Sequence, residues 1–510
     1  MQMKASFVGR EAELQLLDRL WVRSDATLLI LYGRRRVGKT RLLTYWVRQT
    51  GAGESGQDQP ARRVLYWVAE PSSALDQLRS FSQAVYNFAN PQAPAPEDFS
   101  YANWQQAWQQ VAALAQNERL ALLLDEFTYL LEIDPSIAGQ LQNLWDHSLS
   151  RTNLLLVICG SHLGMMLRHT LSYQAPLYGR ATAQLRLQPL PFGMTARYFP
   201  GFDADERVAI YAIWGGIPAY WERLDPAATL SDNIRHELLT ANNLMQAEPR
   251  LLLQDFVNEP HNYVGILRAI ANDARTQGEI AAFSGLAQGH VSQYLSILQD
   301  AGFVERRTPV TQGERSRLGR YHIVDPYLRF YYRFLASRQS QLALGIQEQS
   351  LAEIKRHLRD FIGANTWEEI CREWLLRASA QQTVPVLVDQ VGSAWTRAAQ
   401  ARPERSRRLD VVGVNSMEKT LVLGECKWGP EPSGRSVLTE LVEKTAEIVP
   451  GQGQWQVYYL GFARAGWTDA SHAFAQEVTS APPTGKNWRA CGMRLLDLTQ
   501  VDQDLAAWAG

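Results

Sequence analysis

Cysteine is scarce in this chain, neither sign of charge is in excess, and long hydrophobic runs are absent. No CxxC pair occurs, which excludes the common zinc-binding and redox motifs, and we expect reduced thiols in a cytoplasmic protein. The four cysteines are Cys159, Cys371, Cys426 and Cys491. Because the net charge is −1, any contact with nucleic acid has to come from local basic patches. No run approaches the roughly 20 apolar residues that cross a bilayer, and the N-terminus has no apolar signal core, so we expect no membrane role.

The chain has 510 residues, of which 46% are hydrophobic. A chain of this length is too long to fold around a single hydrophobic core. We expect about three or four domains. In the first half, strand-like apolar runs alternate with stretches of helical spacing, which is the pattern of a parallel sheet covered by helices. These runs are Thr27–Tyr32, Val64–Ala69, Leu120–Leu124 and Leu154–Cys159. The first domain is therefore predicted to be α/β.

The first apolar run leads directly into GRRRVGKT and then into a helical pattern. This is the strand, phosphate loop and helix of a P-loop nucleotide triphosphatase, in which the glycines let successive N–H groups point at phosphates. Lys39 would reach the β- and γ-phosphates, and the Thr40 hydroxyl would hold Mg²⁺. A basic, glycine-containing turn is the alternative. The predicted ATP-binding residues are Gly33, Arg34, Arg35, Arg36, Val37, Gly38, Lys39, Thr40 and Arg41.

Further ATPase residues are expected at the ends of later strands. The run LALLLDEF ends in Asp125, which would organise Mg²⁺, and Glu126, which would polarise the attacking water. Ser161 follows the next strand and either touches the γ-phosphate or is a simple turn residue. Arg180 precedes the last strand, where an arginine could sense the γ-phosphate in cis or from a neighbouring subunit.

Together with FVGREAEL (Phe7–Leu14), WGGIPAYW (Trp214–Trp221) and YHIVDPYLRFYYRF (Tyr321–Phe334), these motifs resemble the archaeal-type ATPases, a branch of the AAA+ and STAND superfamily. The resemblance covers nearly the whole chain. It implies a multidomain α/β protein with an ASCE/AAA+ parallel sheet, a helical lid, a winged helix and a C-terminal nuclease-like domain. It also implies that FVGRE packs beside the adenine and that Gly216-Ile217-Pro218 belongs to a lid that reports the nucleotide state.

The segment Thr276–Arg307 opens with a capping box, and glycines at 285 and 302 separate and end two amphipathic helices. This pattern predicts a helix-turn-helix followed by a β-wing. Its exposed helix face and its wing could contact base edges and phosphates, although such modules also pack between domains. The helix candidates are Gln288, His290, Ser292 and Gln293, and the wing candidates are Arg306, Arg307, Arg315, Arg317 and Arg320.

The segment Arg407–Trp428 alternates apolar and polar residues around the turn NSMEK, which predicts a β-hairpin. Folding it about Met417 brings Asp410 opposite Glu425, whose side chain shares a strand face with Lys427. Such a group could hold Mg²⁺ and polarise a phosphodiester, or it could be a surface ion-pair cluster. The segment is similar to the PD-(D/E)XK nuclease core, and this resemblance implies a metal role for Glu368 on the preceding helix. The arginine-bearing stretch Ala401–Arg408 could be a loop over the site or a phosphate contact.

These observations divide the chain into an ATPase core (1–204), a helical lid (205–258), a winged helix (259–335), a linker helix (336–360) and a nuclease-like domain (361–510). We expect an ATP- and Mg²⁺-dependent switch that controls a DNA-cleaving domain. One alternative is a nucleotide-regulated DNA-binding or scaffold protein whose nuclease fold does not cut. Another is an ATPase that only remodels protein partners. A homo-oligomer is compatible with each of these.

Overall fold

The computed structural model describes residues 7–49, 62–254, 256, 260–313, 315–396 and 408–509. The chain divides into two compact units. Unit 1 comprises residues 1–189 and 217–222, and unit 2 comprises residues 190–216 and 223–510. The stretch 401–407 and the expected lid boundary at residue 258 lie outside the described residues. Among the helices that are described, none combines the length and the apolar character needed to cross a membrane.

Unit 1 is built on a five-stranded sheet in the order β2-β3-β4-β1-β5, in which every neighbouring pair is parallel. The four predicted strands are confirmed, and β5 is the fifth. Because the strands are parallel, their carboxyl ends gather at one edge, where β1, β3 and β4 deliver the loops with the predicted ATPase residues. The strands are β1 (Thr27–Tyr32), β2 (Val64–Val68), β3 (Leu120–Asp125), β4 (Leu154–Gly160) and β5 (Ala183–Arg186).

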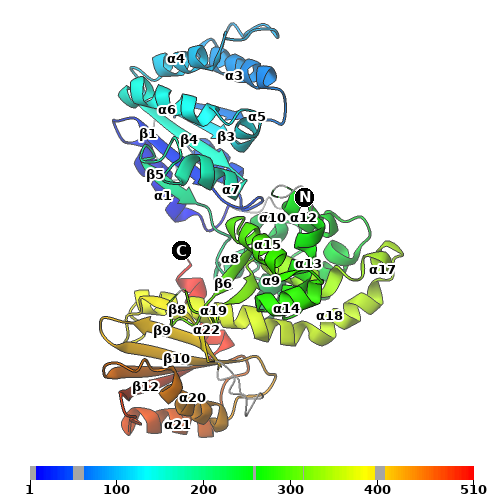
Figure 1. The fold of residues 1–510 in the computed structure, drawn as a ribbon, viewed down its shortest axis with the longest axis vertical. Coiled ribbons are helices and arrows are strands. Elements are labelled where there is room, and N and C mark those ends of the chain that lie inside the picture. The colour runs from blue at the N-terminus through cyan, green and yellow to red at the C-terminus, as the bar shows by residue number, and fades with distance from the viewer. Residues whose placement is uncertain are drawn as a thin grey trace. The chain divides into compact units, whose positions relative to one another are not determined.

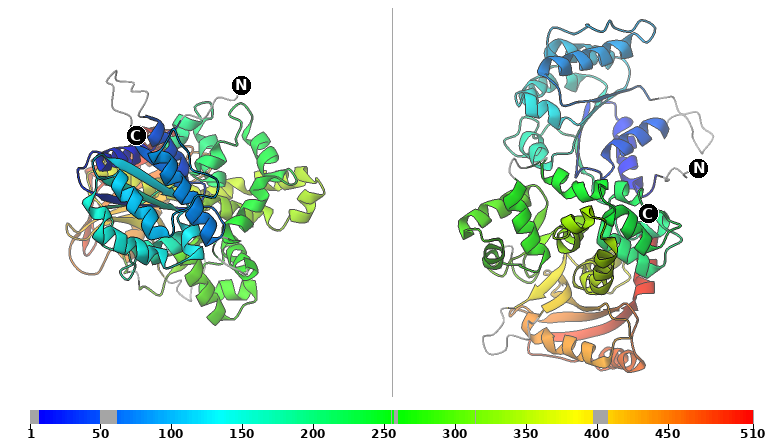
Figure 2. Two further views of the ribbon diagram at one scale, coloured as in Figure 1. Left: turned by 90° about the horizontal axis from the view of Figure 1, so that it is seen from above. Right: turned by 90° about the vertical axis from the view of Figure 1, so that its right-hand side faces the viewer.

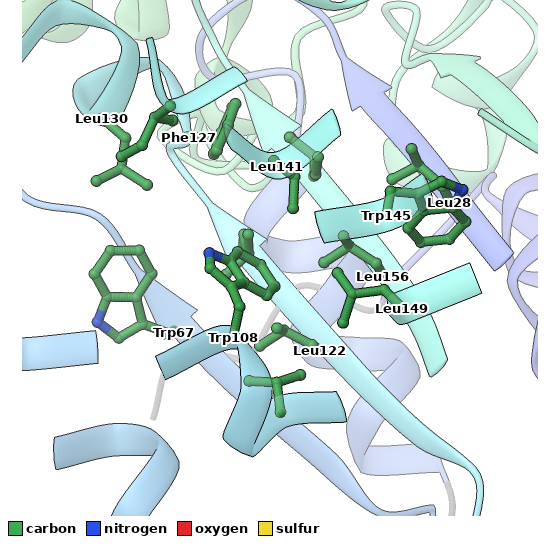
Figure 3. Packing of buried hydrophobic residues seen from close by; sticks show 14 of the residues in the cluster. Leu28, Trp67, Trp108, Leu122, Phe127, Leu130, Leu141, Trp145, Leu149 and Leu156 are labelled. Carbon is green, nitrogen blue, oxygen red and sulfur yellow. The ribbon is translucent and has the colours of Figure 1, made fainter. Parts of the chain in front are cut away.

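Helices cover both faces of this sheet, which is why its central strands are apolar at nearly every position. Alternate residues of β1 belong to different cores. Leu28 and Ile30 belong to the core that includes residues of α3, α4 and α6, whereas Leu29 and Leu31 belong to the core that includes residues of α1 and α2 (Figure 1 shows these elements). Figure 3 shows Trp108 and Leu141 from the helices packed towards Leu122 and Leu156 of the strands. The helices are α1 (Glu11–Trp21), α2 (Lys39–Arg48), α3 (Ala74–Ala89), α4 (Trp104–Leu114), α5 (Thr128–Ile133), α6 (Ile137–His147), α7 (Leu163–Met166) and the short α10 (Pro218–Trp221).

Unit 2 begins with the helix α8, which precedes the expected lid region, and continues through helices of that region into the winged helix. Thr276 and Glu279 form the predicted capping box, and Gly285 ends the helix α14 in the left-handed conformation (φ +71°). The predicted helix-turn-helix followed by a two-stranded β-wing is confirmed, and the two strands of the wing are antiparallel. The elements are α8 (Met194–Tyr198), α9 (Ala204–Trp214), α11 (Leu230–Ile234), α12 (Leu244–Gln254), α13 (Pro260–Ala271), α14 (Gln277–Ser284), α15 (Gln288–Asp300), β6 (Val304–Arg307) and β7 (Arg320–Ile323).

The segment that follows differs from the single linker helix expected over 336–360. Two helices, α17 (Gln339–Ala343) and α18 (Gln347–Phe361), are separated at Gly345, whose left-handed backbone (φ +77°) ends the first helix. From α18 the chain passes through a π-helical segment, Ile362–Trp367, into α19 (Glu368–Ala380) without leaving helical geometry. Before this segment, α16 (Pro326–Phe330) continues into another π-helical turn, Tyr331–Leu335.

The C-terminal part of unit 2 holds a second five-stranded sheet, in the order β12-β11-β10-β9-β8. Its strands are parallel from β12 to β10 and antiparallel from β10 to β8. The helices α20 and α21 lie together on one side of this sheet (Figures 1 and 2), and α19 packs against β8 and β9. The elements are β8 (Gln390–Trp395), β9 (Arg408–Asn415), β10 (Thr420–Lys427), α20 (Arg435–Ile448), β11 (Trp455–Ala463), α21 (Asp469–Ser480), β12 (Trp488–Asp497) and α22 (Leu498–Ala507).

Candidate functional sites

The predicted phosphate loop joins β1 to α2, and two glycines allow its path. Gly38 caps α2 in the left-handed conformation (φ +100°), which side chains with a Cβ adopt rarely. A Cβ on Gly33 would stand only 2.5 Å from the backbone oxygen of Leu187, so the loop passes directly against the chain after β5. The N–H groups at the start of α2 therefore open towards the carboxyl edge of the sheet.

Lys39 lies at the centre of this loop. Its side chain is buried, and Nζ donates to the carbonyl oxygens of Gly33 (2.9 Å) and Arg34 (3.1 Å). Burial lowers the pKa of Lys39, and the nearby Glu126 and Asp125 partly offset this effect. A buried ammonium held within a loop of N–H groups is the arrangement that binds polyphosphates.

Asp125 joins the loop to the neighbouring strand. Its Oδ2 accepts hydrogen bonds from Thr40 Oγ1 (2.6 Å) and from the hydroxyl of Tyr66 on β2 (2.8 Å). Burial, followed by the charge of Asp125, raises the pKa of Tyr66 well above its usual value, so this phenol remains a donor. The role of Tyr66 could not be predicted from the sequence, because neither strand alone indicates that β2 pairs with β3.

Glu126 sits on a backbone with φ +54°, a conformation that is uncommon for a residue with a side chain and that is found most often at functional sites. Its Oε1 accepts a 2.8 Å hydrogen bond from Ser161 Oγ, which follows β4. The ends of β3 and β4 therefore bring Glu126 and Ser161 together, as their places after neighbouring strands would allow.

Two arginines, one in the loop and one in the first turn of α2, contact the segment 217–222 of unit 1. Arg34 Nη2 donates to the Tyr220 hydroxyl (2.8 Å) and stacks over its ring (5.4 Å to the centroid). Arg41 forms an ion pair with Glu222. Arg35 is exposed, and Arg36 has a left-handed backbone (φ +68°).

A further contact with the loop comes from the FVGRE segment. The buried Arg10 donates to the carbonyl oxygens of Val37 (3.1 Å) and Gln188 (2.8 Å). Phe7 of the same segment stacks on Tyr45 of α2 at 4.0 Å. In the sequence, only its place in the FVGRE motif indicates a role for Arg10.

Arg180 is engaged elsewhere. Its Nε and Nη2 donate to the two carboxylate oxygens of Asp146 on α6, at 2.8 and 2.7 Å, and Nη1 donates to the Pro176 carbonyl. This two-pronged ion pair fixes the guanidinium on the helix, so the structure does not bring Arg180 to the side chains of Lys39 or Glu126 in the described residues. Its nucleotide-sensing role stays a prediction.

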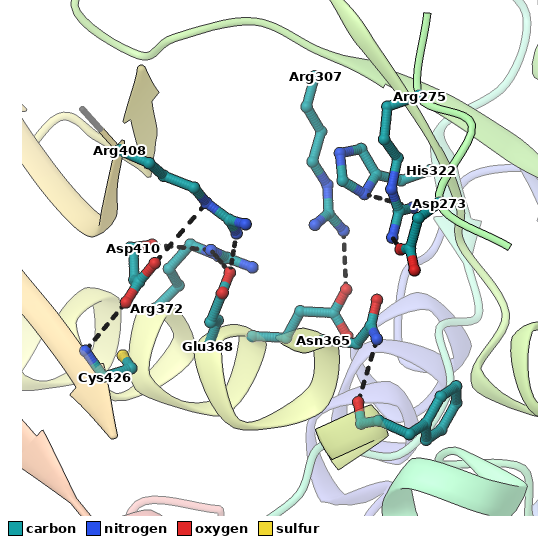
Figure 4. A network of polar contacts seen from close by, with 12 residues as sticks. Asp273, Arg275, Arg307, His322, Asn365, Glu368, Arg372, Arg408, Asp410 and Cys426 are labelled. Atoms are coloured by element: carbon teal, nitrogen blue, oxygen red, sulfur yellow. Dashed lines mark hydrogen bonds and ion pairs between the residues drawn. The ribbon is translucent and has the colours of Figure 1, made fainter. Parts of the chain in front are cut away.

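The C-terminal hairpin has the register expected from its turn, because Gly424 pairs with Val411 and Thr420 pairs with Asn415. Asp410 consequently faces the end of β10, where its Oδ2 accepts a hydrogen bond from the Cys426 N–H (3.1 Å; Figure 4). Glu425 Oε1 accepts from Lys427 Nζ at 2.8 Å. The side chain of Cys426 is a thiol and adds no oxygen ligand to this group. All four cysteines are free thiols.

Glu368, at the start of α19, reaches the same place. Figure 4 shows its carboxylate between the guanidinium groups of Arg408 and Arg372, beside Asp410. Burial, and next the charge of Asp410, raise the pKa of Glu368 to about 7. Burial and Asp410 also raise the pKa of Glu425, against the opposing effects of Lys427 and Lys444.

The next residue on α19, Glu369, contacts the winged helix. Its carboxylate accepts two 2.8 Å hydrogen bonds from Arg329 on α16 and one from Arg307 on β6. Burial alone would raise the pKa of Glu369, but these two guanidinium groups lower it well below its usual range. Beside them, burial and the charge of Arg307 lower the pKa of His322, which lies 3.3 Å from Arg275 (Figure 4).

This network changes the expectation for the wing arginines. Arg307 is bound to Glu305 and Glu369, Arg306 donates to the Ser316 carbonyl, and Arg320 lies over the Trp395 ring at 5.0 Å. These three are therefore engaged within unit 2 rather than presented as phosphate contacts. Arg315 and Arg317 are exposed, as are all four candidates on α15, namely Gln288, His290, Ser292 and Gln293.

The two groups of oxygen ligands differ in how they fit Mg²⁺. The hydroxyl of Thr40 and the carboxylate of Asp125 are adjacent hard oxygen ligands beside the loop, which is the donor chemistry that Mg²⁺ prefers. The C-terminal carboxylates do not fit as arranged, because each is already paired with a cation. Within the described ranges, no group of three or more His, Cys, Asp or Glu side chains could hold a metal ion.

The sheet order, the glycine turn between β1 and α2 and the carboxylates after β3 define a P-loop ATPase domain. Residues 7–224 match the family model described as "ATPase domain predominantly from Archaea". This part of the chain is therefore similar to archaeal-type ATPase domains. Residues 263–306 match the model "Bacterial regulatory protein, arsR family", and residues 331–437 match "Archaea bacterial proteins of unknown function".

Individual relatives match different shares of the chain. An uncharacterized protein of Methanocaldococcus jannaschii is 29% identical over 455 residues, which cover 89% of this chain and 94% of the relative. An uncharacterized ATP-binding protein of the same organism is 60% identical over 37 residues, or 7% of this chain and 63% of the relative. Among solved structures, a Walker-type ATPase of Pyrococcus abyssi is 18% identical, with a TM-score of 0.49, and the match covers 65% of this chain and 97% of that one.

Proposed function

We propose that this chain is an ATP-hydrolysing switch that contacts DNA through unit 2. The observation that carries the proposal is the hydrogen-bonded set at the carboxyl edge of the first sheet, in which Thr40 binds Asp125 and Ser161 binds Glu126. The match of residues 7–224 to an ATPase domain supports the same activity.

Each of these residues has a role in the proposal. Lys39 and the loop N–H groups bind the β- and γ-phosphates, while Thr40 and Asp125 would hold Mg²⁺, which neutralises phosphate charge when bound. Glu126 accepts a proton from the attacking water, and Ser161 orients the Glu126 carboxylate through their hydrogen bond. Tyr66 orients Asp125 from β2.

The switch is supported by the contacts of the short segment 217–222. The segment belongs to unit 1, yet chain of unit 2 precedes and follows it. Tyr220 and Glu222 within it are held by Arg34 and Arg41, which lie in and directly after the phosphate loop. A change at the phosphates would therefore alter the contacts of a segment that continues on both sides into unit 2.

DNA contact is supported by the exposed face of α15 and by the arginines at 315 and 317. The α15 helix carries hydrogen-bonding side chains that can read base edges, and the match of residues 263–306 to a regulatory protein family agrees with such a role. Since α15 itself contains no lysine or arginine, we expect weak, strongly salt-dependent binding.

A second candidate function concerns the C-terminal domain. Its order of helix, three antiparallel strands and two further strands that alternate with helices, with Asp410, Glu425 and Lys427 at the end of the hairpin, supports the nuclease-like fold that the sequence resemblance implies. The pairing of these carboxylates with cations favours a fold that binds DNA without cutting it in this state.

The test combines four measurements on the full-length protein. Phosphate release and binding of a fluorescent ATP analogue are compared for the wild type, Lys39→Ala and Glu126→Gln. Lys39→Ala should lose nucleotide binding, whereas Glu126→Gln should bind but hydrolyse about 100-fold more slowly or worse. Unchanged hydrolysis in Glu126→Gln would contradict the assignment of the base.

DNA binding is then followed by fluorescence anisotropy over a salt series, with and without ATP. Binding that weakens with salt and is reduced in Gln288→Ala/Gln293→Ala supports α15 as the reader. No binding at low salt would favour an ATPase that acts on protein partners. Plasmid cleavage with Mg²⁺ or Mn²⁺ that disappears in Asp410→Ala would show that the C-terminal domain cuts.

A further inference from the structure

Three carboxylates from different elements meet at the open end of the C-terminal hairpin. Glu368 and Glu425 are buried, at 6% and 8% exposure, and the Asp410 side chain is 14% exposed. Three negative charges placed together in a buried site repel one another unless cations neutralise them. The chain itself supplies four cations around them, namely Arg408, Arg372, Lys427 and Lys444.

Arg408 differs from the other three because it alone spans two of the carboxylates. Its Nη2 forms an ion pair with Glu368, and its Nε lies 3.7 Å from Asp410 Oδ1 (Figure 4). Arg408 and Asp410 are two residues apart on β9, so the strand places both side chains on one face.

The remaining cations hold the edges of the cluster. Arg372 binds Glu368 one turn away on the same helix and otherwise donates to the Asp410 carbonyl, not to its carboxylate. Lys427 pairs with Glu425 Oε1, and Lys444 lies 3.6 Å from Glu425 Oε2. Neither lysine has a described ion pair with Glu368 or Asp410.

We propose that the Arg408 guanidinium is the resident cation of this cluster and excludes divalent metal from Glu368, Asp410 and Glu425. A divalent ion would have to contact the carboxylate oxygens of Glu368 and Asp410 together, and the Arg408 guanidinium already contacts both carboxylates. The inference rests on the proposed nuclease-like character of the domain. It adds that the domain's own Arg408 side chain keeps metal ions from its carboxylates.

The test measures Mn²⁺ binding to the full-length, nucleotide-free protein by electron paramagnetic resonance. Arg408→Gln should gain one Mn²⁺ site that binds at least about tenfold more tightly than any Mn²⁺ site in the wild type, because one positive charge has been removed from between the carboxylates. The double variant Arg408→Gln/Asp410→Asn should lose this gain. Arg435→Gln is the matched control, because it removes an exposed arginine paired with Glu477 elsewhere in the domain.

Arg408→Met keeps most of the apolar stem and serves as the second variant if Arg408→Gln does not fold. The proposal is overturned if a folded Arg408 variant gains no Mn²⁺ site, or if the wild type already binds Mn²⁺ through Asp410 as tightly as the variant does. Because the readout is metal binding, it is separate from cleavage: an Arg408 variant that binds Mn²⁺ but leaves DNA uncut would contradict the nuclease candidate and leave this inference intact.

Discussion

Replacing Glu369 with glutamine tests whether buried charges fix the winged helix to α19. The substitution keeps the shape of the side chain but removes the negative charge that accepts three 2.8 Å hydrogen bonds from Arg329 and Arg307. The Arg329 side chain is only 4% exposed, so water cannot replace its lost partner. Leaving one partner of a buried ion pair uncompensated costs about 3–5 kcal/mol.

This cost translates into a measurable shift in melting temperature. Unit 2 contains about 300 residues, and an unfolding entropy of about 2 cal/mol/K per residue gives about 0.6 kcal/mol/K. Glu369→Gln should therefore lower the melting temperature of unit 2 by about 5–8 °C in scanning calorimetry. Glu477→Gln is the control, since this 58% exposed side chain makes a surface ion pair with Arg435, for which we expect a shift of about 1 °C or less.

The pH dependence provides a second reading of the same contact. The pKa of Glu369 is lowered in the folded state. Its ion pairs therefore stabilise the folded state fully above the usual glutamate pKa of about 4.3, and this stabilisation is lost as the pH falls below that value. The difference in melting temperature between the wild type and Glu369→Gln should be constant near neutral pH and should become smaller below about pH 4. Equal melting temperatures for Glu369→Gln and Glu477→Gln at pH 7 would refute the reasoning.

Three further predictions concern unit 1. Tyr66→Phe removes the 2.8 Å hydrogen bond to Asp125 and should slow ATP hydrolysis a few-fold in a phosphate-release assay; an unchanged rate would show that Thr40 orients Asp125 alone. Arg180→Ala should lower stability, measured by urea unfolding, by about 1 kcal/mol through loss of the partly exposed Asp146 pair. If it abolishes hydrolysis without this change, Arg180 senses nucleotide after all. Gly33→Ala should prevent binding of an ATP analogue, because its Cβ would stand 2.5 Å from a backbone oxygen; normal affinity would show that the loop can shift.

The parts of the sites that lie close together in sequence could be predicted well. The glycine spacing around Lys39 and the position of Asp125 at the end of an apolar strand follow from local chemistry, and the NSMEK turn alone set Asp410 against the end of β10. Such features depend on backbone geometry within one turn or hairpin, which the residues themselves determine.

Several other contacts between distant segments could not be predicted, because they depend on how the strands and helices are arranged. Tyr66 contacts Asp125 only because β2 lies next to β3. The order of strands in a sheet cannot be predicted from the residues of a single strand. Glu368 and Glu369 look alike in sequence, yet successive helix positions point about 100° apart, so one meets Arg408 and the other meets Arg307. Counting arginines on the wing could not reveal that three of them bind within unit 2.

The path of the chain between the two units also restricts how such a protein can be divided or recombined. Because Ile217–Glu222 counts with unit 1 while unit 2 surrounds it in sequence, no single cut yields an intact ATPase unit. A fragment that ends at residue 189 would lack Tyr220 and Glu222, the partners of Arg34 and Arg41. Recombination of whole modules would thus have to exchange the helices around this segment as well, which ties the inheritance of the ATPase to that of its attached domains.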